Sequence, residues 1–239
     1  VAADRGDLVK ANKYFLAAGQ NAPETYPPAL RREFGLKALE AKLAVKDIKQ
    51  AQLIADELAK MVKDGPDKGQ LDFLRGNLMA ELGKLNEAMR LWHDVASRRE
   101  LPAWPKAEMA LIEQGLATKT LKPAGAIERL EKLRYVWRGD ALERRVLQML
   151  AQLNLQVGDN AAGLQTYREL ATLFPDSPEA RNATDAMSKA FARLFIDGEA
   201  GGDVADRGRA EAGVADAERG RRARVRVAVQ HAEAVDHPD

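Results

Sequence analysis

The residues best suited to acid–base chemistry in this chain are His93 and its neighbour Asp94. His93 is the only one of three histidines that lies outside the last nine residues. Histidine titrates near neutral pH and can act as a general base when a carboxylate orients it. Adjacent residues on a helix point in different directions, however, and no serine nucleophile pattern accompanies this pair. The pattern therefore predicts a partly exposed surface histidine.

Other motifs that suggest chemistry have simpler structural explanations. Residues 65–70, Gly-Pro-Asp-Lys-Gly-Gln, share glycines with phosphate-binding loops but lack the Gly-Lys-Ser/Thr ending and a preceding strand. We expect a turn between two helices there. Residues 138–140 spell the cell-adhesion tripeptide Arg-Gly-Asp, and at a helix boundary they predict a turn whose Asp caps the next helix. Glu128 and Lys132, four residues apart, predict a solvated ion pair on a helix surface.

The composition excludes several further classes of site. The chain has no cysteine, so disulfides, thiolate zinc sites and thiol catalysis are excluded. Its 37 Lys and Arg balance 36 Asp and Glu, so the whole chain is not a polycation built for nucleic acid. No stretch approaches the ~18 apolar residues of a membrane-spanning helix. We expect no catalytic, cofactor-binding or metal site, no nucleic-acid partner and no membrane insertion.

The last 41 residues, 199–239, differ in composition from everything before them. They use only nine residue types: Ala, Arg, Val, Gly, Asp, Glu, His, Gln and Pro. Their basic cluster from Arg219 to Arg226 could bind phosphates, but the segment has seven Arg against nine Asp and Glu and no aromatic residue for base stacking. Two interpretations remain open: a disordered low-complexity tail, or GC-rich coding DNA read out of frame, because all nine types have codons that begin with G or C.

Residues 1–198 contain a repeat, and we treat them as one helical repeat domain. Each copy places a small residue five positions after its start, and in the clearest copies an aromatic residue follows four positions later. The small residues are spaced 40, 37, 38 and 37 positions apart. They are Ala11, Ala51, Ala88, Ala126 and Gly163. A near-constant spacing of this length indicates a repeat architecture.

Each copy predicts a helix that follows a tight turn, because apolar residues recur at helical spacing after it. Gly83 and Gly158 suit the left-handed conformation that ends the preceding helix. Asp176 or Ser177 suits the cap of a last helix near 177–196. Another amphipathic segment precedes each of four copies, at 28–45, 67–82, 104–118 and 140–157. The predicted fold is all-α: antiparallel helix pairs stacked into a right-handed superhelical solenoid.

This arrangement resembles the tetratricopeptide repeat. In residues 69–102, Gly76, Ala88 and Trp92 occupy matching positions, and residues 144–175 match with Gly163 in place of the usual Ala. The period of 37–40 is longer than the 34 of the family, and the aromatic positions of the first helix are mostly lost. Residues 166–180 also resemble repeats of bacterial envelope-assembly proteins. The resemblance implies a bacterial protein, for which the periplasm or envelope and the cytoplasm both remain open.

The resemblance implies a concave groove that is lined by the first helix of each pair and takes a peptide or a partner helix. Asn77 matches one position of the family's carboxylate clamp, but Phe73 stands where a Lys is needed, so we expect no clamp. For Leu36, Leu43 and Leu111, packing between repeats is the alternative. The groove residues that the resemblance implies are Leu36, Glu40, Leu43, Phe73, Asn77, Glu81, Leu111, Thr118, Gln148, Gln152 and Gln156.

The function implied by the resemblance is a protein–protein interaction scaffold without catalysis. The alternative is a structural spacer within a larger envelope-associated repeat protein. A lone helix at each end of the repeat should leave apolar residues exposed, which predicts a fragment of a longer chain or self-association through uncapped ends. The residues concerned are Leu8, Ala11 and Phe15 at the start, and Met187, Phe191, Leu194 and Phe195 at the end.

Overall fold

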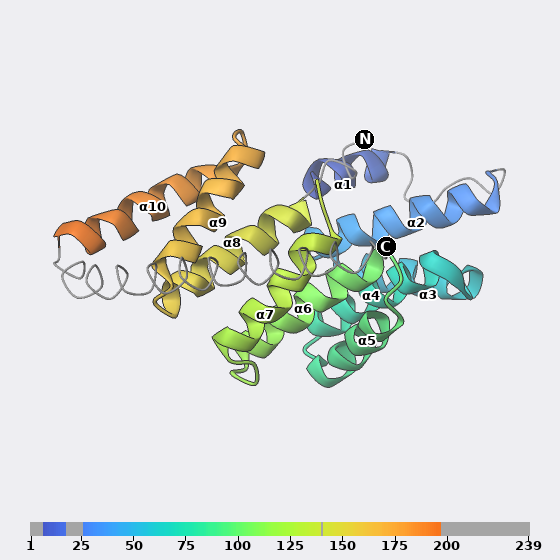
Figure 1. Cartoon of the computed structure of the whole chain (residues 1–239). Helices are drawn as coiled ribbons and strands as arrows, with labels where there is room; N and C mark the ends of the chain where they lie inside the picture. The colour runs from blue at the N-terminus through green and yellow to red at the C-terminus, as the bar shows by residue number, and fades with distance from the viewer. Residues whose placement is uncertain (1–6, 18–25, 140, 197–239) are drawn as a thin grey trace, which may run out of the picture. The chain divides into compact units, whose positions relative to one another are not determined.

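The computed structural model describes residues 7–17, 26–139 and 141–196, and within them every regular element is an α-helix (Figure 1). The chain divides into two units, residues 1–184 and 185–239. The predicted tail at 199–239 and the Asp of the 138–140 turn lie outside the described residues. The helices are α1 (Leu8–Ala17), α2 (Pro28–Ala44), α3 (Ile48–Met61), α4 (Gly65–Glu81), α5 (Leu85–Arg98), α6 (Ala103–Ala117), α7 (Pro123–Val136), α8 (Ala141–Gln156), α9 (Asn160–Leu173) and α10 (Pro178–Ile196).

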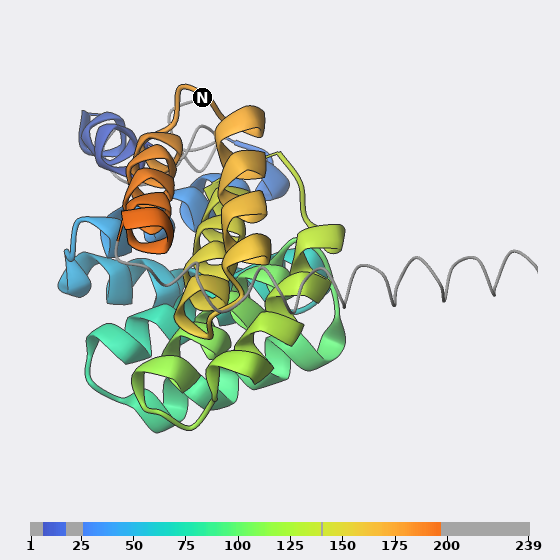
Figure 2. The ribbon, with the colours of Figure 1, turned by 60° about the vertical axis from the view of Figure 1, so that its left-hand side comes forward.

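The helices follow the predicted order of one lone helix, four pairs and a last helix. Within the first unit, α2 packs on α3, α4 on α5, α6 on α7 and α8 on α9, while α1 packs on α2. Figure 2 shows α9 beside α8. The predicted solenoid of antiparallel helix pairs is therefore confirmed. No helix among the described residues has both the length and the hydropathy to cross a bilayer.

Local sequence sets where the helices begin and end. Gly83 and Gly158 have φ of +75° and +87°, the left-handed conformation predicted for them. The Ser177 hydroxyl accepts the Ala180 N–H at 3.0 Å, so Ser177 caps α10 as one of the two predicted candidates. Asp159 caps α9 in the same way, accepting the N–H of Ala162 at 3.0 Å.

One predicted turn is wrong. Residues 65–70 form the first turns of α4, because Gly65 takes φ +70° and Pro66 fits the first turn of a helix. Helix α4 therefore begins at Gly65, and Gly69 lies within it and not in a loop.

The small residue of each repeat lies where two helices cross. Ala51, Ala88 and Ala126 have no exposed surface, and a Cβ added to Gly163 would lie 2.7 Å from the Leu155 side chain. Close approach of the two backbones leaves no room for larger groups. The small residue of each repeat therefore allows the two helices of a pair to pack closely.

The expected exposure at the ends is observed only in part. Ala11 is buried, whereas Phe191 on α10 is 56% exposed. Leu8 and Met187 are half-buried, and the side chains of the other named end residues lie outside the described part of the chain.

Gly76 offers a test of helix contact within the second pair. Ala normally stabilises a helix by about 0.5–1 kcal/mol over Gly, but a Cβ at Gly76 would overlap the Trp92 indole. We expect Gly76→Ala to lower the free energy of unfolding by about 1–3 kcal/mol, measured by urea denaturation.

Gly69 on the same helix is the matched control. A Cβ there would lie 3.4 Å from the Ala103 side chain, an ordinary contact. We expect Gly69→Ala to stabilise the protein slightly, and equal effects of the two substitutions would contradict the close packing of α4 on α5.

Candidate interaction surface

The apolar residues predicted to line the groove lie in the core. Leu36, Phe73 and Leu111 are 3%, 8% and 3% exposed and share one hydrophobic cluster that extends from α2 to α6. Leu43 belongs to the same cluster. The inner face of the first three pairs is therefore filled by the protein's own side chains, and a partner could touch little of these residues without displacing them.

The acidic residues predicted for the same face already have partners. The Glu40 carboxylate on α2 lies 3.6 Å from Lys106 Nζ on α6, and both side chains are about a quarter exposed. Glu81 on α4 lies 3.4 Å from Lys46 Nζ in the link before α3. The Glu81 pair connects neighbouring repeats and the Glu40 pair connects the first repeat to the third, so both add polar contacts to the apolar packing of the face.

Asn77 also contributes to the tertiary structure. Its side-chain oxygen accepts a hydrogen bond from Trp92 Nε1 at 3.1 Å, which ties α4 to α5. The absence of a carboxylate clamp at this position stays a prediction. Thr118, at the end of α6, is exposed, and its hydroxyl donates to the Gln114 carbonyl at 2.8 Å.

The predicted groove residues on α8 are more accessible. Gln148, Gln152 and Gln156 follow one another at intervals of four along the helix; Gln148 is half-buried and the other two are exposed. Burial raises the pKa of the Tyr167 phenol, and the Gln152 amide, which bonds the Tyr167 hydroxyl, offsets this only in part. An amide both donates and accepts, so this row can bond the N–H and C=O groups of a passing main chain. We call Gln148, Gln152 and Gln156 the amide row.

A buried ionic cluster between α4 and α5 was not anticipated from the sequence. The Asp72 side chain is 3% exposed and accepts hydrogen bonds from Lys68 and, at 3.0 Å, from Arg98 Nη2. Lys68 lies one turn before Asp72, which is the signal that sequence reasoning could have used. The cluster stabilises the pair and offers no open site.

The remaining candidates are surface features. His93 is exposed, as predicted. Glu128 and Lys132 form the predicted ion pair, with Lys132 Nζ 2.7 Å from the carboxylate. Within the described residues, no group of three or more His, Asp or Glu side chains could hold a metal ion.

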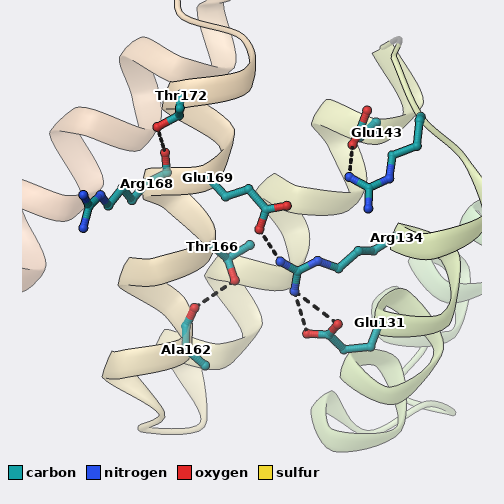
Figure 3. Close-up of polar contacts among 9 residues, drawn as sticks. Glu131, Arg134, Glu143, Ala162, Thr166, Arg168, Glu169 and Thr172 are labelled. Carbon is teal, nitrogen blue, oxygen red and sulfur yellow. Dashed lines mark hydrogen bonds and ion pairs between the residues drawn. The ribbon is translucent and has the colours of Figure 1, made fainter.

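Arginine–glutamate pairs connect the third helix pair to the fourth (Figure 3). Arg134 at the end of α7 donates to both oxygens of Glu131 at 3.2 Å and also reaches Glu169 on α9. Arg145 on α8 lies across from Glu113 on α6, with Nη2 donating to Oε2 at 2.8 Å and Nε 2.5 Å from Oε1. One pair thus joins the second helices and the other joins the first helices.

Glu113 should make stability depend on pH. Burial raises the pKa of its carboxyl above the ordinary 4.5, and the attraction of Arg145 offsets this only in part. A carboxyl with a raised folded pKa stabilises the fold below about pH 4.5, and that contribution is lost as the pH rises through the folded value. Gln does not titrate. As the pH rises from acidic to neutral, we therefore expect the free energy of unfolding of Glu113→Gln to increase relative to that of the wild type, as measured by urea denaturation.

Glu128→Gln is the control of opposite sign. The hydrogen bond and charge of Lys132 lower the pKa of the Glu128 carboxyl. The contribution of Glu128 to the stability of the fold is therefore present above pH 4.5 and is lost as the pH falls through the lowered value. Parallel pH profiles for the wild type and Glu113→Gln would show that Glu113 titrates as a free carboxyl.

Comparisons with known proteins found similar chains only among solved structures. No family model matches the chain, and no curated protein matches it. Two crystal structures of a "putative kinesin light chain" with nearly identical TPR-like repeats from Podosopora anserina are similar to it, one of them a point variant. Each is 14% identical and covers 72% of this chain and 89% of the matched chain, with TM-scores of 0.43 and 0.41. The helix pairs of this chain form an α-helical solenoid, and its similarity to these solved structures is low.

Proposed function

We propose that the protein is an interaction scaffold that binds a peptide or partner helix along α8. The observation that supports this best is the amide row, in which Gln152 and Gln156 are exposed on one helix face. Uncharged amides suit a segment of modest charge, because they bond its polar groups without the desolvation penalty of burying a charge. The first three pairs then support the fourth pair and bind no partner through these positions, because the side chains of Leu36, Phe73 and Leu111 are buried in their core.

Removal of the exposed amides should weaken binding, and urea denaturation checks the fold of each variant, because Gln152→Ala also removes the amide that bonds the Tyr167 hydroxyl. We expect Gln152→Ala combined with Gln156→Ala to reduce affinity for a partner by roughly tenfold, because each lost hydrogen bond costs about 0.5–1.5 kcal/mol. The partner is first captured by a photo-crosslinking residue at position 156, and its affinity is then measured by titration calorimetry.

Gln165 on α9 is the matched control, because it is an exposed glutamine on a second helix. Crosslinking at position 165 and the substitution Gln165→Ala should leave capture and affinity unchanged. Equal crosslinking at positions 156 and 165, or full affinity of the double variant, would contradict binding along α8. Phe73→Ala would be a poor test, since it would disturb the core instead.

A structural spacer inside a larger envelope-associated protein is the second candidate. The closed inner face of the first three pairs supports it, because the Glu40–Lys106 ion pair joins α2 to α6 across the intervening repeat. A spacer needs stiffness and no ligand. Substitutions in the amide row would then have no effect on any interaction, whereas Lys106→Met would loosen the first three pairs.

A further inference from the structure

The junction between the third and fourth helix pairs differs from the others in how its first helices meet. In the earlier pairs, α4 packs directly on α2, and α6 packs directly on α4. The described part of α8 packs mainly on α7 and α9, and it contacts α6 through the Arg145–Glu113 ion pair. The row of directly packed first helices therefore ends at α6.

Long ion-paired side chains span this junction. Glu113 and Arg145 link α6 to α8, and Arg134 and Glu169 link α7 to α9. Such pairs keep their contact over a range of helix positions, because several torsions lie between each charge and its backbone. Close-packed apolar side chains tolerate much less displacement.

Apolar contact at the junction is concentrated around α7. Leu130 and Leu133 of α7 share one cluster with Val146 and Leu150 of α8, and all four are fully buried. The cluster also includes Met109 and Ile112 of α6, so it extends from the third pair into the fourth, and it is separate from the core that runs from α2 to Leu111. The fourth pair is therefore held to the third by this apolar cluster as well as by the two ion pairs.

Residues 137–139, the described part of the link between α7 and α8, contain one glycine in a left-handed conformation. Gly139 takes φ +93°, which glycine adopts without strain. The buried Glu143 carboxylate at the start of α8 accepts the Gly139 N–H and pairs with Arg138 Nη1 at 3.3 Å. The link is thus anchored to α8 by one carboxylate and turns on a glycine on the side of α7.

We propose that the third and fourth pairs form a flexible joint. The fourth pair pivots on the apolar cluster shared by α6, α7 and α8, and the ion pairs Arg134–Glu169 and Arg145–Glu113 hold it at its resting angle. The proposal is independent of what the amide row binds. It makes the orientation of the fourth pair adjustable while the first three pairs stay fixed.

Distances between spin labels can test the joint, because the chain has no native cysteine to interfere. The pair His93→Cys and Arg168→Cys spans the junction from α5 to α9, and Leu53→Cys with His93→Cys reports on α3 and α5 alone; all three positions are exposed. We expect Arg134→Gln with Arg145→Gln to widen the junction-spanning distribution by about 2 Å or more, the scale of helix shifts at mobile interfaces. The reference distribution should not change.

Arg129→Gln is the matched control, since Arg129 Nε pairs with Glu108 at 2.7 Å within the third helix pair and spans no junction. Glu113→Gln with Glu169→Gln removes the same two charge pairs at constant side-chain volume, and it replaces the arginine variant if that one does not fold. An unchanged junction-spanning distribution in the folded charge variant would overturn the proposal. Equal widening of both distributions, or equal widening in Arg129→Gln, would also overturn it.

Discussion

The close crossing of the two helices in each pair is the constraint on which the rest of this structure depends. Ala51, Ala88 and Ala126 are completely buried at these crossings, and Gly163 takes the same place in the fourth pair. A small residue lets the backbones approach, and in the second, third and fourth pairs a large residue one turn later fills the space beside it. Trp92 shows this most directly, because it packs over Gly76 and bonds Asn77.

Once the pairs form, the first three stack with their inner sides in contact. This closes the face that a peptide groove would need, since Leu36, Phe73 and Leu111 meet in one cluster. The polar residues of that face then bond each other, as Glu40 and Lys106 do. The fourth pair is joined differently and keeps its amide row accessible, so any recognition by first helices is expected there.

Several charged side chains form ion pairs that hold helices together. Asp72 is buried with Lys68 and Arg98 inside one pair, and Arg134 joins two pairs through Glu169. A buried carboxylate needs such partners, because removing one leaves an uncompensated charge or donor.

The sequence alone determined the helices, their pairing and their order, because these follow from local signals: the apolar period, the glycines that end helices and the regular small residue. It did not decide which first-helix residues stay accessible. Gln152 and Leu36 both occupied predicted groove positions, yet one is exposed and the other buried. That difference depends on how closely successive pairs stack, which is a sum of many contacts between residues far apart in the chain. Only the tertiary structure shows that α4 and α6 continue the row of first helices and that α8 does not.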